Sequence, residues 1–367
     1  MNLAAACFAQ SYAEARGLFS AAAQASGLTI ESHPHPLPGR DSEPLALDVA
    51  RDGAADARAL LLISSGCHGV EGFCGSGLQV ALLTDRAWQA ALRRSGVAVL
   101  YLHGLNPYGF SWWRRTTHEN VDLNRNWQDF SAPLAANPEY DRLAPLLVPP
   151  TWPPGADVEA AIDAYKAEFG DKAFQAAVSR GQYDHPDGLF FGGREPTWSQ
   201  RTLRQVLREH ARTCRQLGWI DIHTGLGPNG YGERIFTGPD DGASVARARQ
   251  WWGAEVTSVY DGSSTSALLT GLMWTGAVQE APQACFTGIA LEYGTLPSKQ
   301  VVDALRLDQW LQNHPEVPAD LRRHHKRSVR DAFYTDTDEW KQRIVQQGTE
   351  AARQALAALA AELASAG

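Results

Sequence analysis

The sequence predicts an α/β fold with a mixed, mostly parallel central sheet flanked by helices, followed by a helical C-terminal tail. Three observations carry this prediction. Short apolar runs alternate with segments of helical pattern along most of the chain. Most of these runs are apolar at nearly every position, which is typical of parallel strands buried on both faces. Beyond Lys299 the pattern is helical to the end.

The first part of the chain is expected to alternate between helix and strand. An Ala-rich helix is expected at Ser11–Ser26, because Gly27 follows as a stop signal. Leu45–Arg51 alternates between apolar and polar residues, as a half-buried strand does. The next three elements are a buried strand, a helix and another buried strand, at Ala59–Ser64, Gly77–Leu92 and Val97–Leu102.

Two further apolar runs end in residues that carry chemistry. Gly218–Ile222 runs directly into His223, and Gly288–Glu292 ends in a carboxylate. Ligands of parallel sheets bind beyond the carboxyl ends of the strands, so we expect the functional site there.

We expect one domain over residues 1–367, with a core at about 55–300 and a helical C-terminal extension at about 301–367. Residues 131–204 are less regular and are expected to form an insertion beside the site. The insertion contains a proline-rich loop, a helix and an aromatic, turn-rich stretch, at 149–155, Val158–Glu168 and Gln182–Arg194.

Composition excludes several classes of protein. With 33 basic and 41 acidic residues the net charge is −8, so the chain lacks the basic surface of a nucleic-acid binder. No apolar run approaches the ~20 residues that span a bilayer, and we expect no membrane partner. The five cysteines show no regular spacing, which favours free thiols in a reducing compartment. Residues 3–7 look like a lipoprotein cleavage box, but no basic region or apolar run precedes them, and we expect a cytoplasmic protein.

Three residues suggest a metal site. His68 and Glu71 form an H-x-x-E pattern directly after a predicted strand, a pattern that occurs about once by chance in such a chain. His223 follows another strand. Two imidazoles and a carboxylate leave a fourth position open, which is the ligand pattern of catalytic rather than structural zinc. Cys67 is expected to point away from this site, because side chains alternate along a strand.

Two further residues suggest substrate chemistry. Arg125 lies among Asn124, Asn126 and Trp127, a cluster suited to holding a planar carboxylate through two parallel hydrogen bonds, although a polar surface loop is the alternative. Glu292 would be costly to bury without a partner, and a general base near a metal site is one reason for a carboxylate there.

Three further patterns lie between the first two ligands and His223: N-P-x-G-F at 106–110, W-R at 113–114 and V-D-x-N-R-N-W at 121–127. In this order, the H-x-x-E, these patterns, the distal His and the strand-end Glu together resemble the zinc carboxypeptidase clan, which includes carboxypeptidase A-like enzymes and the succinylglutamate desuccinylase/aspartoacylase branch. The sequence around His68 is most similar to that of an uncharacterised bacterial metallocarboxypeptidase-like group of that clan. The resemblance implies a carboxypeptidase-like fold and one zinc ion bound by His68, Glu71 and His223. It also implies roles for five further residues: Asp122 orienting a histidine ligand, Arg114 stabilising the oxyanion, Asn124 and Arg125 binding the substrate carboxylate, and Glu292 as general base. The clan's mobile tyrosine has no secure match, with Tyr260 and Tyr293 as candidates.

The expected function is a zinc-dependent hydrolase that cleaves an amide or peptide bond next to a free carboxylate, in a small molecule or short peptide. Two alternatives stay open: an N-acyl amino acid deacylase of the desuccinylase/aspartoacylase type, and a non-catalytic module that binds carboxylates. A dinucleotide site at residues 225–230 (G-x-G-x-x-G) is disfavoured, because a strand or loop rather than a helix is expected after it. The sequence does not indicate the oligomeric state.

Overall fold

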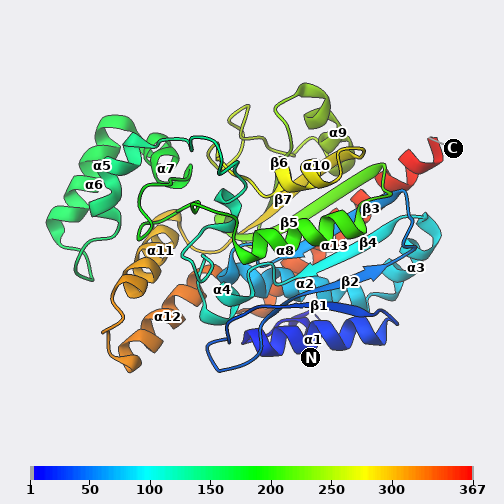
Figure 1. The fold of residues 1–367 in the computed structure, drawn as a ribbon, viewed down its shortest axis with the longest axis horizontal. Coiled ribbons are helices and arrows are strands. Elements are labelled where there is room, and N and C mark those ends of the chain that lie inside the picture. Colours follow the sequence, from blue (N-terminus) through cyan, green and yellow to red (C-terminus); the bar gives the residue numbers. More distant parts are fainter. Residues whose placement is uncertain (1–3, 366–367) are drawn as a thin grey trace.

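A seven-stranded sheet runs through the middle of the computed structural model, which describes residues 4–365 (Figure 1). The strand order is β1-β2-β4-β3-β5-β7-β6. The four central strands pair in parallel, and the pairs β1–β2, β2–β4 and β6–β7 at the two sides are antiparallel. The bounds are β1 Ile30–Pro34, β2 Ala46–Asp52, β3 Ala59–Ser65, β4 Ala98–His103, β5 Gln216–Asn229, β6 Gly232–Thr237 and β7 Cys285–Gly294. The predicted mixed, mostly parallel α/β sheet is confirmed.

Helices bury both faces of the sheet, and strand alternation explains the continuous apolar runs. Leu61 and Ile63 of β3 enter one hydrophobic core, while Leu60 and Leu62 enter the other. The first core is covered by α1 Tyr12–Ala25, α2 Gly72–Thr84, α3 Arg86–Ser95, α9 Gly242–Trp252 and α13 Asp338–Ser365. The second is covered by α8 Trp198–His210 and α10 Trp274–Glu280.

A third group of helices lies beyond one end of the sheet (Figure 1). Its apolar core also includes Val70, the residue between the two predicted ligands of the H-x-x-E pattern. This layer therefore packs directly onto the predicted site. Its helices are α5 Pro138–Leu147, α6 Ala156–Phe169, α7 Asp171–Ser179, α11 Ser298–Asn313 and α12 Ala319–Phe333.

The structure differs from the sequence prediction at three boundaries. The single helix expected at Gly77–Leu92 is two helices, because Asp85 ends α2 and its carboxylate accepts hydrogen bonds from Ala87 and Trp88 to begin α3. The residues apart from the sheet end before α8, earlier than position 204, since α8 packs on the sheet itself. Strand β1 was not predicted, because its residues are only partly buried.

Residues 225–230 follow the prediction. They end β5 and turn into strand β6 rather than into a helix. Among residues 4–365, no helix is both long and apolar enough to cross a bilayer.

Candidate metal centre and active site

A tight turn after β3 positions the first two predicted ligands. His68 precedes a short 3-10 helix at Gly69–Glu71, and backbone N–H groups of this turn donate to the carbonyls of Arg114 and Arg115 at 2.8 and 3.2 Å. A Cβ on Gly69 would lie 2.1 Å from the carbonyl carbon of Gly109. Only glycine permits this approach, so the turn packs directly against the backbone of the short helix α4 Pro107–Trp112.

The structure brings His68, Glu71 and His223 together. The Nδ1 atoms of the two histidines lie 3.2 Å apart. Glu71 Oε1 lies 2.9 Å from His68 Nδ1, and Glu71 Oε2 lies 3.2 Å from His223 Nδ1. The three side chains are buried, with 5%, 2% and 4% of each residue exposed. Their ligand atoms form a compact group of the size that holds one metal ion.

A carboxylate behind each histidine fixes its orientation. His223 Nε2 lies 2.5 Å from Asp221 Oδ2, and His68 Nε2 lies 3.3 Å from Asp122 Oδ1. If each Nε2 carries the proton, both Nδ1 atoms present lone pairs to each other and to Glu71. Three facing acceptors repel one another unless a cation lies between them, which is the chemistry of a metal site.

Asp221 is a functional candidate that the sequence analysis did not assign. Its side chain lies on the same face of β5 as His223, because the two residues are two positions apart in one strand. Asp221 Oδ1 accepts a hydrogen bond of 2.5 Å from Ser64, whose hydroxyl in turn accepts one of 2.7 Å from Trp219 Nε1. This chain of bonds holds the carboxylate against the imidazole. The Asp-x-His pattern at the end of a predicted strand is the sequence signal that could have identified Asp221 as a site residue.

The arginine at the cluster is Arg115. Its Nη1 donates to Glu71 Oε1 at 3.1 Å and its Nε donates to Asp122 Oδ2 at 2.9 Å. Burial alone would raise the pKa of the Asp122 carboxyl, but the charges of Arg115, Arg125 and His68 hold it well below its usual range. Asp122 therefore stays ionised beside His68.

The structure does not bring Arg114, the predicted oxyanion residue, to this cluster. Its guanidinium donates to Asn120 at 2.6 Å and lies 3.5 Å from the carboxylate of Asp308 in α11. The backbone of Trp113 adopts a left-handed conformation with φ 52°, which turns the chain immediately before the two arginines. Consecutive side chains then leave the loop in different directions.

Glu292 lies on the strand next to His223. The two residues are register partners on the parallel strands β5 and β7, so both side chains project from the same face. Glu292 Oε1 accepts a hydrogen bond of 2.9 Å from the backbone N–H of Leu226. Burial, and then the charge of Glu71, raise the pKa of Glu292 to about 7. The carboxylate is thus suited to exchange a proton near neutral pH.

Asn124 and Arg125 lie next to the cluster but are engaged by protein groups. Arg125 is 2% exposed. Its Nε and Nη2 both donate to the carbonyl of Ser179 at the end of α7, and its Nη1 donates to the carbonyl of Asn124. Asn124 Oδ1 accepts from the Met273 backbone N–H. Arg125 Nη1 also lies 3.9 Å from Asp122 Oδ1. Within residues 4–365, two of the five N–H groups of Arg125 make no hydrogen bond to the protein and can donate to a ligand.

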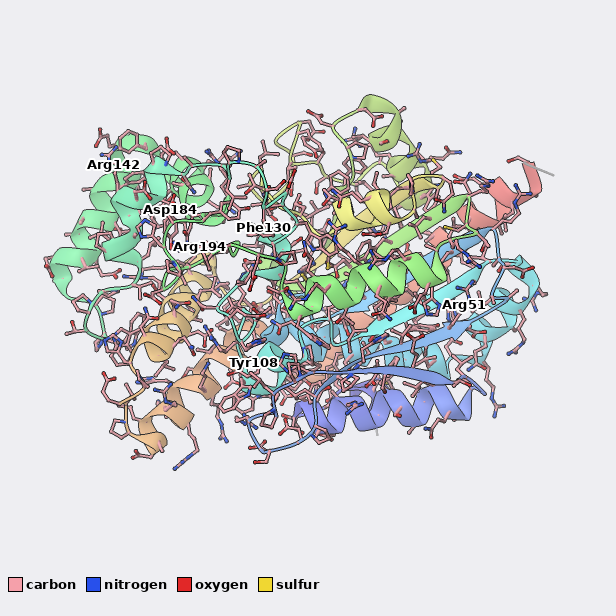
Figure 2. The ribbon with its side chains drawn as sticks, viewed as in Figure 1. Arg51, Tyr108, Phe130, Arg142, Asp184 and Arg194 are labelled. Carbon is pink, nitrogen blue, oxygen red and sulfur yellow. The ribbon has the colours of Figure 1, made fainter. Side chains whose placement is uncertain are left out.

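The two candidate tyrosines do not contact the cluster in this structure. The Tyr260 hydroxyl donates to the carbonyl of Gly238 at 2.9 Å, and the buried Tyr293 hydroxyl donates to the carbonyl of Ile344 at 3.2 Å. The helices of the insertion lie at the end of the molecule where Arg142 is labelled, opposite Arg51, whereas its Ser179 carbonyl reaches Arg125 beside the cluster (Figure 2).

Comparisons with solved structures return low similarity. Carboxypeptidase A from Helicoverpa armigera has a TM-score of 0.44 and 13% identity, over 88% of this chain and 73% of that chain. A candidate metallopeptidase from Shewanella amazonensis has a TM-score of 0.42 and 16% identity, over 82% and 92%. A candidate succinylglutamate desuccinylase/aspartoacylase family protein from the same organism has a TM-score of 0.35 and 17% identity, over 78% and 73%. At such values, the activity has to be inferred from this chain's own residues.

No curated protein matches the sequence. One family model does match, over residues 8–347, and it is described as a protein of unknown function, DUF2817. Because this match spans most of the chain, the protein belongs to the DUF2817 family.

Proposed function

We propose that the protein is a zinc-dependent hydrolase that cleaves an amide or peptide bond next to a free carboxylate. One observation carries the proposal: the two Nδ1 atoms of His68 and His223 face each other and Glu71 at 2.9–3.2 Å, while their Nε2 atoms face carboxylates. Ligand atoms of a tetrahedral zinc site with bonds of 2.0–2.1 Å lie about 3.3 Å apart, so these residues fit the ion.

The zinc ion would be held by His68, Glu71 and His223, with Asp221 and Asp122 orienting the two imidazoles. When bound, zinc supplies Lewis acidity that acidifies a water molecule and polarises a carbonyl. Arg115 is paired with Glu71 at 3.1 Å and with Asp122 at 2.9 Å, and its charge helps to hold the pKa of the Asp122 carboxyl well below its usual range.

Glu292 is the proposed general base. With a pKa of about 7 its carboxylate can accept the proton of the attacking water and return it to the leaving amine. Arg115, rather than Arg114, is the proposed stabiliser of the developing oxyanion, because its guanidinium is the one at the cluster. Its Nη2 is not needed for either ion pair and could donate to the substrate.

The substrate carboxylate is assigned to Arg125 and Asn124. The two unused N–H groups of Arg125 form the donor set for one carboxylate, and Ser179 fixes the guanidinium in place. Deep burial of the cluster favours small substrates or chain ends over internal segments of a folded protein. An N-acyl amino acid and a short peptide both present the required carboxylate.

The test combines metal content with turnover in full-length protein. Zinc per chain is measured by elemental analysis, and hydrolysis is measured with blocked dipeptides and with N-acyl amino acids. Glu292→Gln should keep zinc and lose turnover, whereas His68→Ala and His223→Ala should lose both. His314→Gln, a histidine remote from the cluster whose Nδ1 contacts the Trp310 carbonyl, is the matched control.

Turnover by Glu292→Gln at the wild-type rate would refute the base assignment. Zinc retention by both alanine variants would refute the metal site. Cleavage of N-acyl amino acids alone would identify a deacylase, and zinc-loaded protein that binds carboxylates without turnover would identify a binding module.

A further inference from the structure

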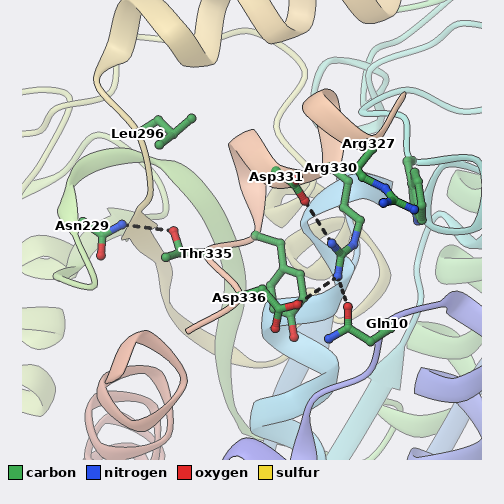
Figure 3. Close-up of a pocket in the computed structure, with 10 residues that line it drawn as sticks. Gln10, Asn229, Leu296, Arg327, Arg330, Asp331, Thr335 and Asp336 are labelled. Atoms are coloured by element: carbon green, nitrogen blue, oxygen red, sulfur yellow. Dashed lines mark hydrogen bonds and ion pairs between the residues drawn. The ribbon is translucent and has the colours of Figure 1, made fainter. Parts of the chain in front are cut away.

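We propose that a pocket lined by none of the proposed metal ligands binds a small organic carboxylate. The pocket has a volume of about 590 Å³ and lies at the end of α12, beside the segments that follow β5 and β7 (Figure 3). None of the residues that line it belongs to the metal cluster. Its volume lies within the range of ~300–1,000 Å³ that is usual for small-molecule sites.

Two buried donors at this pocket have no acceptor. Arg330 is 7% exposed, and its terminal nitrogens contact Asp331 at 3.0 Å, Asp336 at 3.6 Å and the side chain of Gln10. Among residues 4–365 its Nε has no hydrogen-bond partner, and neither has the buried Nε1 of Trp113. A buried N–H without an acceptor is destabilising, so such groups call for an explanation. Both side chains line the pocket, so a ligand oxygen can reach these buried nitrogens if the two side chains shift slightly on binding.

Arg327 adds a free positive charge to the same wall. It precedes Arg330 by three residues in α12 and therefore lies on the same side of the helix. Figure 3 shows the two side chains next to each other. Arg327 is exposed, and within residues 4–365 its guanidinium has no hydrogen bond or ion pair.

Trp113 is held in an unfavourable backbone conformation at this pocket. Its φ of 52° and ψ of 53° place it in the left-handed region, which a bulky residue rarely adopts. The Arg40 guanidinium lies 3.8 Å from the centroid of its ring. This contact fixes the indole from outside the pocket. Strain of this kind concentrates at ligand-binding sites.

The charge balance favours a carboxylate over a dianion. The carboxylates at the pocket are already paired: Asp331 with Arg330 at 3.0 Å, and Asp336 with Arg330 at 3.6 Å and with Lys341, which lies outside the lining, at 2.5 Å. Arg327 is then the one uncompensated charge among the described lining residues, which suits a monoanion. Leu296 and the aromatic ring of Tyr334 complete the wall with apolar surface for a carbon chain.

The test is calorimetric titration of the full-length protein with three probes at constant ionic strength: butyrate, inorganic phosphate and butylammonium. Butyrate should bind in the millimolar range, more tightly than phosphate, and butylammonium should not bind. Arg327→Gln should weaken butyrate binding by ~10-fold or more, since a hydrogen-bonded charge is lost. Trp113→Phe should weaken it by a smaller factor while retaining the ring.

Arg323→Gln is the matched control, because Arg323 is exposed on the same helix and does not line the pocket. It should bind butyrate as the wild type does. Wild-type affinity in Arg327→Gln, tighter binding of phosphate than of butyrate, or no heat with butyrate would each overturn the proposal. Because Arg327 makes no hydrogen bond or ion pair with any residue in 4–365, its replacement tests the ligand rather than folding.

Discussion

Replacing Asp221 by asparagine should weaken metal binding without removing a metal ligand. Asp221 Oδ2 lies 2.5 Å from His223 Nε2, so the carboxylate holds both the tautomer and the direction of the imidazole. Asparagine keeps the volume and the bond from Ser64, but it removes the negative charge. The variant therefore isolates the electrostatic contribution of the carboxylate from its shape.

The expected size follows from the bond that is lost. A hydrogen bond to a charged group contributes about 1.5–3 kcal/mol, which corresponds to roughly 10- to 150-fold in a binding constant. Loss of a carboxylate that accepts the hydrogen bond from the non-ligating ring nitrogen of a histidine ligand typically lowers metal affinity ~10- to 100-fold. The two estimates agree, and we expect zinc to dissociate about 10- to 100-fold more readily from Asp221→Asn.

The assay is competition for zinc with a fluorescent chelator, together with a melting curve of the metal-free protein. Asp184→Asn, an exposed aspartate, is the control and should leave the zinc affinity unchanged. An affinity of Asp221→Asn within twofold of the wild type, in a protein that melts normally, would refute the reasoning. Ser64→Ala should give a smaller effect in the same direction, because it removes one bond to the carboxylate.

Three further predictions concern the surroundings of the site and the core. Arg115→Gln should lower kcat/KM on whichever substrate is turned over by ~100-fold, whereas Arg114→Gln should chiefly lower the melting temperature. Gly69→Ala should abolish zinc binding, because its Cβ would lie 2.1 Å from backbone, whereas Gly242→Ala, which meets no atom within 4 Å, should be neutral. Burial lowers the pKa of His103 to about 4 in the fold, from 6.5. The unfolded chain therefore binds more protons between these values, and acidification from pH 7 to 4 should cost about 3 kcal/mol of stability in urea unfolding, a loss that His103→Gln should reduce.

Each of these predictions has a contradicting outcome. Equal kinetic losses in the two arginine variants would show that Arg115 has no special position. Normal zinc content in Gly69→Ala would show that the loop can move away from the turn. A pH dependence of unfolding that is the same in His103→Gln would assign the acid sensitivity to other groups.

The core strands could be predicted from the sequence because their signal is local. Ala59–Ser64 and Val97–Leu102 are apolar at nearly every position, and the structure places β3 and β4 there, buried on both faces. Edge strand β1 carries no such signal, since its residues are polar and partly exposed. The break between α2 and α3 depends on one capping carboxylate, that of Asp85, inside a run that otherwise favours helix.

The candidate site also combines features that the sequence could predict with features that it could not. Ligand types at strand ends predicted that His68, Glu71 and His223 belong together, and the structure brings them to within 2.9–3.2 Å. Their roles as ligands stay a prediction until metal is measured. The sequence could not predict which of the two adjacent arginines, Arg114 or Arg115, lies at the metal cluster. The left-handed backbone at Trp113 decides this, and it places Arg115 there.

The sequence by itself determined the alternation of strands and helices and the chemical identity of the residues at the strand ends. These are local properties, because the apolar periodicity depends on residues close together in the chain and the ligand type depends on the side chain itself. Only the tertiary structure decided that the Asp221 carboxylate meets the His223 ring, that the Ser179 carbonyl accepts from Arg125, and that Trp113 and Arg330 line one pocket. The last two arrangements join residues far apart in the chain, and the direction of every one of these side chains depends on the packing of the whole fold.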